Sequence, residues 1–425
     1  MLMLIVALTF FVLVLFGMPL YFAFGFSASI ACIAGGLPLE IIAQRLMIGM
    51  DSFALLAIPG FILVGQIMCQ GGISKRAVDF SNALIGHLTG GLSMVAVLTG
   101  MVMGGISGSA VADTAAVASV LVPSMEEEKY PRDFSAAVVG TAGPLGNIIP
   151  PSIPMIVYSM TSGLSLLSLF LAGYIPGMMI GFGLMVLCYF IARKRAYGGT
   201  HTQFTWQRVV VTFRRSILAV LTPLIIVGGI LTGIFTPTES AMIGVIYSLI
   251  VAIHIYREMS WRDMPEVLLD SAKNTAKLVI IIAGASVFSY ISINEGLPQM
   301  FTDFMFGISE NKWVILLLLN IILLAVGLII DILVATVIIV PVLMPLCEAM
   351  GFDPLHIAMI FIMNMSIGLL TPPVGYCLFV SSAIADVPVE RVALRTVPIV
   401  LAMLGILFLI NVFPQLTLFI PSLIR

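Results

Sequence analysis

Long, continuous runs of apolar residues dominate the hydropathy pattern of this chain, and short polar, glycine-rich or proline-rich segments separate them. The runs at 166–192 and 216–256 are apolar on all sides. Strands of a β-barrel would instead give short runs in which apolar and polar positions alternate. Apolar runs of this length predict helices that cross a lipid bilayer. We therefore expect an all-α polytopic membrane protein.

One apolar stretch in the first half of the chain is interrupted near its middle. Residues 91–103 and 110–122 flank a glycine- and serine-rich break at 104–109. Each arm would rise only ~20 Å as a helix, which is less than the ~30 Å of the hydrocarbon core. This length favours a re-entrant helical hairpin over 91–122. A pair of glycine-kinked helices that pack through small residues is the alternative.

The second half carries a matching hairpin pattern, and both halves contain a second kind of interruption. A break at 327–331, with an acid at its end, predicts a hairpin at about 312–347. Pro-Pro pairs interrupt two further apolar segments, near 143–153 and near 366–375. Two consecutive prolines remove two backbone donors and leave carbonyl oxygens on the preceding turn without helical partners. We expect proline-broken helices at both places.

These interruptions belong to an internal repeat. A set of positions in the first half shares its residue types with positions in the second half at one constant spacing. Thr114, Pro123, Gly146, Pro150, Pro151, Ser159, Pro176 and Gly183 match Thr336, Pro345, Gly368, Pro372, Pro373, Ser381, Pro398 and Gly405. Repeated, interrupted helices are typical of secondary transporters, which build a central site from them.

The distribution of positive charges predicts that the two halves have opposite orientations in the membrane. The segment 193–215 contains basic residues and no acid, so the positive-inside rule places it in the cytoplasm. The basic residues of 257–277 return to the same side, whereas the equivalent loop at 36–52 is better placed outside. We therefore predict two inverted-topology repeats, 1–192 and 216–425, joined by a basic cytoplasmic linker.

Composition supports a membrane protein and limits its chemistry. Hydrophobic residues make up 60% of the chain and charged residues 9%, which is too little polar surface for a soluble globule of this size. Mean hydropathy is +1.16. The cysteines and histidines have no metal-ligand spacing, and no phosphate-binding loop is present. We expect no metal other than sodium, no organic cofactor, no use of ATP and no nucleic-acid partner.

Carbonyl oxygens and hydroxyl groups at the breaks suit a hard cation such as Na⁺. We predict two sodium sites related by the repeat. The first comprises Ser107, Ser109, Gly143, Gly146 and Ile149, and the second comprises Gly327, Asp331, Met365, Gly368 and Thr371. Neighbouring helices or water molecules could satisfy the same carbonyls instead. The candidate substrate ligands are polar residues at the same breaks: Ser109, Asn147, Asn364 and Thr371.

Two acids lie at or near the predicted hairpin tips. A carboxylate inside a membrane costs ~2.5–3.5 kcal/mol on insertion scales, so Asp113 and Asp331 are both functional candidates. The position of Asp331 at the tip favours a functional role over helix capping. Asp113 lies about one turn into its helix, where an acid also interacts favourably with the helix dipole, so both interpretations stay open. Glu239 follows Pro237 and is better explained as a helix-start residue.

Several segments together resemble the large membrane subunit of TRAP (tripartite ATP-independent periplasmic) transporters. They are 104–109 with Ala112-Asp113, Pro123-Ser124-Met125, 149–153, 236–239 and 370–375. The resemblance implies a multi-pass protein of the bacterial inner membrane that imports an organic acid with sodium. It implies two partners, a periplasmic solute-binding protein and a small membrane subunit of about four helices, which we expect to be a separate chain. It also implies an elevator-type movement of both hairpins and both broken helices against the leading helices of each half.

We expect a sodium-coupled importer of a small organic acid, and not an enzyme. The acid stays open among C4-dicarboxylates, keto acids, sialic acids and sugar acids. A passive channel is one alternative. An intramembrane serine protease is another, because 105–108 matches a G-x-S-G string with Ser107 as the nucleophile. Such a protease needs a histidine on a facing helix, and only His254 lies at the end of a plausible span.

Overall fold

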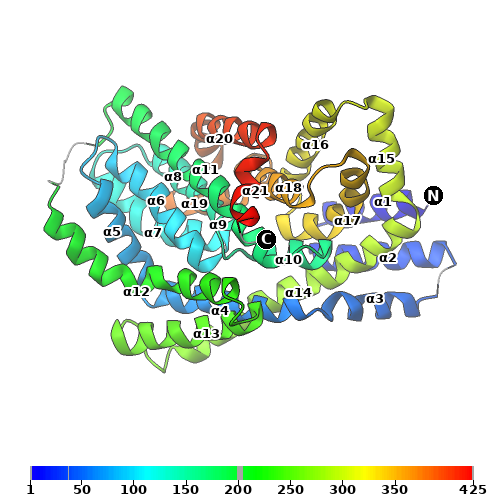
Figure 1. Ribbon diagram of the computed structural model, residues 1–425, viewed down its shortest axis with the longest axis horizontal. Coiled ribbons are helices and arrows are strands. Elements are labelled where there is room, and N and C mark those ends of the chain that lie inside the picture. The colour runs from blue at the N-terminus through cyan, green and yellow to red at the C-terminus, as the bar shows by residue number, and fades with distance from the viewer. Residues whose placement is uncertain (1, 37, 199–203, 424–425) are drawn as a thin grey trace.

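The computed structural model describes residues 2–36, 38–198 and 204–423. Every regular element in these ranges is a helix, and the helices follow one another in two similar halves (Figure 1). The first half opens with a group of leading helices: α1 (Leu2–Leu15), α2 (Leu20–Ala34), α3 (Glu40–Met50), α4 (Ala57–Gln70) and α5 (Ile73–Ile85). A short 3₁₀ helix, Phe53–Leu56, precedes α4.

A hairpin, a broken helix and one long helix complete the first half. The hairpin consists of α6 (Gly91–Ser107) and α7 (Ala110–Glu127). The broken helix consists of α8 (Arg132–Ala142), α9 (Leu145–Ile148) and α10 (Ile153–Ser162), and the long helix is α11 (Leu166–Arg195).

The second half repeats this order. Its leading helices are α12 (Trp206–Leu231), α13 (Pro237–Leu249), α14 (Met264–Asn294) and α15 (Leu297–Ile308), and a π-helical turn, Ile250–Ile255, extends α13. The second hairpin consists of α16 (Lys312–Gly327) and α17 (Ile332–Met350). The second broken helix consists of α18 (Pro354–Gly368) and α19 (Tyr376–Ala385), followed by α20 (Val389–Val412) and α21 (Gln415–Ser422).

Helical hairpins occupy both predicted positions, but the first break is much shorter than the predicted 104–109. Helix α6 continues through Ser107, so only Gly108 and Ser109 separate it from α7. The helical Gly104 has a packing role, because a Cβ there would lie 2.7 Å from the Cα of Gly146 on α9. The turn itself depends on Gly108, whose φ of +61° is a left-handed conformation that glycine adopts without steric penalty.

Two segments that we expected to be loops are largely helical. Helix α12 begins at Trp206, so much of the basic segment 193–215 is helical, and residues 199–203 lie outside the described part of the chain. Helix α14 begins at Met264, so Lys273 and Lys277 are helical residues. Both lysines are exposed, so their charges stay accessible although the residues lie within the helix.

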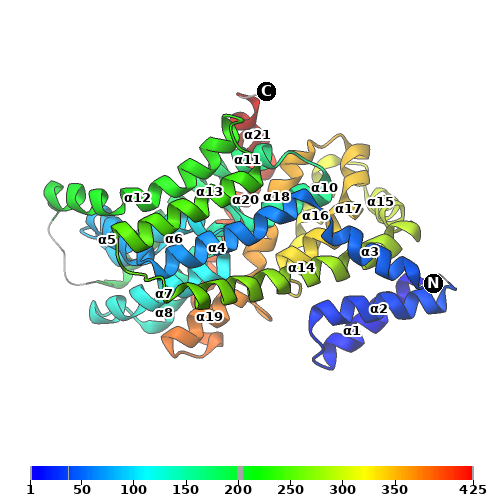
Figure 2. The ribbon, with the colours of Figure 1, turned by 90° about the horizontal axis from the view of Figure 1, so that it is seen from below.

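The two repeats cross over each other in the centre of the molecule. Helix α10 of the first broken helix packs against α17 of the second hairpin, and α19 of the second broken helix packs against α7 and α8. In Figure 1 the two hairpins lie on either side of α9 and α10, and Figure 2 shows α4, α13 and α14 across the face below them. We use the term hairpin body for α6–α10 together with α16–α19.

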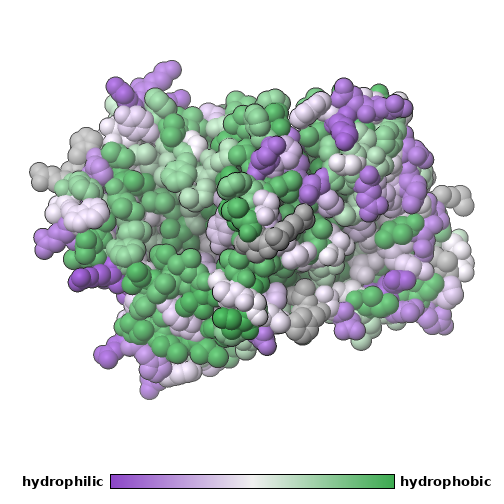
Figure 3. All heavy atoms as spheres, viewed as in Figure 1, coloured by the Kyte–Doolittle hydropathy of each residue, from purple (hydrophilic) through white to green (hydrophobic). Residues whose placement is uncertain are grey.

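Six helices of the described residues are long and apolar enough to cross a membrane, or seven if the bent pair α4–α5 is counted as one span. Hydrophobic residues cover most of the face in Figure 3, and hydrophilic residues lie mainly toward its margins. The hairpin helices α6 and α16 are apolar but shorter than these spans. This distribution matches the polytopic membrane protein that the sequence predicts.

Candidate functional site

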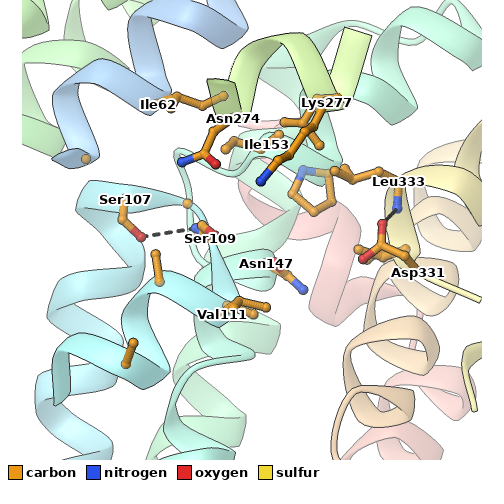
Figure 4. A pocket seen from close by; sticks show the side chains of 18 of the residues that line it. Ile62, Ser107, Ser109, Val111, Asn147, Ile153, Asn274, Lys277, Asp331 and Leu333 are labelled. Carbon is orange, nitrogen blue, oxygen red and sulfur yellow. Dashed lines mark hydrogen bonds between the residues drawn. The ribbon is translucent and has the colours of Figure 1, made fainter. Parts of the chain in front are cut away.

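A cavity of about 550 Å³ lies where the tips of the two hairpins approach each other (Figure 4). The tip of α6–α7, the start of α10 and the start of α17 form one side, and α4 and α14 form the opposite side. The polar side chains in the lining are Gln66, Ser107, Ser109, Asn147, Asn274, Lys277 and Asp331. The cavity therefore lies between the hairpin body and the leading helices.

The turn of the first hairpin positions Ser107 and Ser109. Gly108 reverses the chain, and Ser109 takes the extended N-cap conformation of α7. The backbone N–H of Ser109 donates a hydrogen bond to Ser107 Oγ at 3.1 Å. The Ser107 hydroxyl in turn donates to Asp113 Oδ1 at 2.5 Å. The two serines and Asp113 therefore form one hydrogen-bonded chain behind the tip.

Asp113 is fully buried, and its second carboxylate oxygen has no hydrogen-bond partner among the described residues. The backbone of α9 lies against that oxygen, because a Cβ on Gly146 would stand 2.4 Å from Asp113 Oδ2. An unpaired carboxylate oxygen is costly in an apolar environment, and a cation is a partner that would stabilise it. Asp113 accepts from the Ser107 hydroxyl and not from the first amides of α7, which favours a functional role over helix capping.

Asp331 lines the same cavity from the second hairpin. Its side chain caps α17, where it accepts a hydrogen bond from the backbone N–H of Leu333 at 2.9 Å (Figure 4). The residue is only partly buried. Asp331 thus combines a structural role at the start of the helix with access to the cavity.

The first broken helix contributes Asn147. Its side chain is 3% exposed, it lines the cavity, and its Nδ2 group has no partner among the described residues. The backbone N–H of Ile153 donates to the carbonyl of Gly108 at 3.3 Å, which ties the broken helix to the hairpin tip. The Pro150–Pro151 and Pro372–Pro373 peptide bonds are both cis, so the two repeats share this local geometry.

Three residues of the predicted first sodium site are absent from the cavity lining: Gly143, Gly146 and Ile149. Gly143 packs against α7, where a Cβ would stand 1.9 Å from Thr114 Oγ1. The side chain of Ile149 packs against Gly177 on α11. The structure therefore brings together Ser107, Ser109 and Gly146 from the predicted set, through Asp113.

Four residues of the predicted second sodium site lie near one another and are absent from the cavity lining: Gly327, Met365, Gly368 and Thr371. A Cβ on Gly327 would stand 3.4 Å from the Cα atoms of both Met365 and Gly368. The Thr371 hydroxyl donates to the carbonyl of Ile367 at 3.1 Å. Asp331 is the member of this set that reaches the cavity.

Asn364 lies in a different environment from the one we predicted. Its Nδ2 group donates to Asn320 Oδ1 at 2.8 Å, and Asn320 Nδ2 donates to Asn411 Oδ1 at the same distance. These asparagines link α18, α16 and α20. Asn364 is absent from the cavity lining, so the geometry gives no support to its predicted contact with the substrate.

The polar residues of the opposite wall are not among the site residues that the sequence predicts. Asn274 and Lys277 lie on α14 and Gln66 lies on α4. Charge alone predicts that Lys277 belongs to a basic loop. The spacing of 274, 277, 278 and 281, which all line the cavity, is that of one helical face and was the available signal.

Two repeats of hairpin and broken helix, which meet at a central cavity beside a layer of leading helices, define a secondary transporter. The family model of the DctM component of the tripartite ATP-independent periplasmic transporter matches residues 7–416. The chain belongs to this family of large TRAP permeases.

Individual relatives agree with this assignment. A 2,3-diketo-L-gulonate TRAP transporter large permease of Escherichia coli is 41% identical over 377 residues, which cover 89% of this chain and 88% of the relative. A sialic acid TRAP transporter large permease of Vibrio cholerae is 36% identical over 408 residues, which cover 96% and 95%. The crystal structure of the Alcanivorax borkumensis YdaH transporter has a similar fold, with a TM-score of 0.64, 14% identity and 89% coverage of both chains.

The family assignment confirms a multi-pass protein of the bacterial inner membrane that is not an enzyme. TRAP permeases work with a periplasmic binding protein and a small membrane subunit. The serine protease alternative loses its support, because the family consists of permeases and the Ser107 hydroxyl donates to Asp113. The ring of His254, the histidine that the protease alternative would need, packs beside Trp261.

Proposed function

We propose that this permease imports a small organic acid together with sodium ions and that the acid binds in the cavity between the hairpin tips. The observation that carries the proposal is the pairing of two opposite chemistries at one place. Cationic and amide donors line the cavity, and a buried carboxylate with an unpaired oxygen lies directly behind the tip of the first hairpin. The first suits an anion and the second suits a cation.

The donors come from both sides of the cavity. Lys277 and Asn274 extend from α14 toward the side that Ser109 and Asn147 form (Figure 4). Ser109 is the N-cap residue of α7, and the free backbone amides and the dipole of a helix N-terminus attract an anionic group. A carboxylate placed between these groups would bridge the hairpin body and the leading helices.

Sodium is a co-transported substrate in this proposal. Asp113, the Ser107 hydroxyl and backbone carbonyls near Gly143 and Gly146 offer the oxygen ligands that a hard cation prefers. The repeat suggests a second ion near Asp331 and the carbonyls around Gly368 and Thr371. Asp331 repels an anionic substrate unless a cation neutralises it, which gives coupling a physical reason.

The hairpin body would move as a unit against the leading helices in an elevator-type cycle. Its two hairpins and two broken helices pack on one another across the repeats. The cavity lies between the hairpin tips on one side and α4 and α14 on the other, and α14 also packs directly against α17. A periplasmic solute-binding protein would deliver the acid, and a small membrane subunit would complete the complex. The relatives named for 2,3-diketo-L-gulonate and sialic acid support an acid of this general kind.

Uptake into proteoliposomes that contain the permease, its small subunit and its binding protein tests the proposal. The substrate panel comprises a C4-dicarboxylate, a keto acid, a sialic acid and a sugar acid. We expect one of them to accumulate above its external concentration under an inward sodium gradient and to lose this accumulation when potassium replaces sodium. Accumulation without sodium contradicts the coupling. Flux that only equilibrates the substrate would instead support a passive channel.

A further inference from the structure

A second cavity, of about 530 Å³, opens between α8, the end of α11 and the start of α20. Four of its lining side chains are cationic: Lys194, Arg195, Arg391 and Arg395. One is acidic, Asp133. The central transport site shares none of these residues, so the cavity has a chemistry of its own.

The single carboxylate leaves a surplus of positive charge in this cavity. Asp133 Oδ2 accepts a hydrogen bond from Arg395 Nε at 2.7 Å, and the side chains of this ion pair are 20% and 32% exposed. The pair fixes one guanidinium group in the wall. Lys194, Arg195 and Arg391 lie around it. The nearby acids Asp386 and Glu390 do not line the cavity.

An exposed apolar surface continues from the cavity along two membrane-spanning helices. On α11, Val186 and Phe190 precede Lys194 at four-residue spacing, so they lie on the same helical face, and both are more than half exposed. On α20, Leu394 and Leu401 follow Arg391 on one face and are 74% and 61% exposed. A cationic cavity at the helix ends thus lies next to exposed apolar side chains of two candidate membrane spans.

We propose that this cavity binds the phosphate headgroup of an anionic phospholipid of the phosphatidylglycerol type. Basic pockets between transmembrane helices recognise such headgroups, and arginine forms paired hydrogen bonds with phosphate oxygens. The acyl chains lie along Phe190 and Leu394, and a soluble anion would leave these exposed apolar side chains without a partner. A zwitterionic lipid brings an ammonium group into the same cluster of cations and binds less well. This site is independent of the proposed transport reaction.

Lipid retention by the purified full-length permease tests this inference. Native mass spectrometry would compare phosphatidylglycerol with phosphatidylethanolamine, added at equal concentration to delipidated protein in detergent. We expect the wild-type protein to retain phosphatidylglycerol preferentially. The double variant Lys194→Gln, Arg391→Gln leaves the Asp133–Arg395 pair intact. It should bind phosphatidylglycerol roughly 30-fold more weakly, since each cation near the headgroup contributes ~1 kcal/mol.

The matched control is Arg208→Gln, Arg214→Gln, which removes the same charge from exposed positions on α12. It should retain the lipid like the wild type. Equal retention of both lipids by the wild type overturns the inference without any variant. An equal loss in the cavity and control variants also overturns it, because general surface charge would then explain the binding. Displacement of the lipid by inorganic phosphate at comparable concentration would assign the cavity to a soluble anion.

Discussion

Among the site residues, we expect Asp113 to have the largest effect on the sodium dependence of transport. Asp113→Asn preserves the shape of the side chain and an acceptor for Ser107 while it removes the charge. We expect the sodium concentration that gives half-maximal uptake to rise at least about tenfold, because a charged ligand contributes roughly 1.5–3 kcal/mol. Initial uptake rates over a range of sodium concentrations measure this change. Asp303→Asn, an exposed position on α15, is the matched control, and an identical sodium dependence in both variants would contradict the role of Asp113.

Lys277 should set the affinity for the substrate rather than for the ion. We expect Lys277→Gln to raise the KM for the acid by roughly tenfold or more, because a charge-assisted hydrogen bond to the carboxylate is lost. Lys277→Arg keeps the charge and should recover part of the affinity. Lys273→Gln, about one turn earlier, removes only an exposed ion pair with Asp270 at 3.6 Å and should change little. Equal KM values for the two glutamine variants would remove Lys277 from the site.

The candidate site could be predicted from the sequence only where a residue lies beside a break in the chain. Ser107, Ser109, Asn147 and Asp331 are polar residues next to a glycine turn or a Pro-Pro pair, and all four line the cavity. Lys277 is an internal residue of a long helix, where its charge resembled a loop signal. The partners of Asn364 are asparagines on α16 and α20, and this pairing across helices leaves no pattern in a single chain.

At the scale of elements, each hairpin packs against its broken helix through glycines. Gly104 meets Gly146 in the first repeat, and Gly327 meets Gly368 in the second. The sequence predicted both hairpins and both breaks, because glycines and prolines interrupt apolar runs there. The first turn is shorter than the sequence predicts, because glycines occur for two different reasons. Gly104 allows the close approach of a neighbouring helix, and only Gly108 reverses the chain.

This close packing of glycines predicts that one added methyl group at Gly368 lowers both stability and uptake. A Cβ on Gly368 would stand 2.4 Å from the carbonyl oxygen of Gly327, so Gly368→Ala must push the second hairpin away from α18. We expect a lower Tm, in line with the ~1–3 kcal/mol cost of overpacking, and a strongly reduced uptake rate. Thermal unfolding in detergent and uptake in proteoliposomes measure the two effects. Gly405→Ala, a helical position with open space around it, should be neutral or slightly stabilising.

Elevator-type transport requires two bodies of the molecule that move against each other. The hairpin body contains the breaks, Asp113 and Asp331, whereas α4 and α14 supply the opposing wall of the cavity. The order of the elements within each half was predictable from the repeat. The crossing of α10 onto α17 and of α19 onto α7 depends on contacts between distant segments, and one sequence does not reveal them.

A disulfide between the two bodies tests the movement most directly. A Cβ on Gly105 of α6 would stand 3.8 Å from the Cβ of Pro223 on α12, which matches the usual separation of about 3.8 Å in a disulfide. Gly105→Cys with Pro223→Cys would be introduced into a protein without the five native cysteines. Gly140→Cys with Ser381→Cys, 3.5 Å apart and both inside the hairpin body, is the control. We predict that oxidation abolishes uptake only in the Gly105–Pro223 pair and that a reductant restores it. Full uptake by the oxidised Gly105–Pro223 pair, with the disulfide verified by mass spectrometry, would contradict movement of the hairpin body against the leading helices.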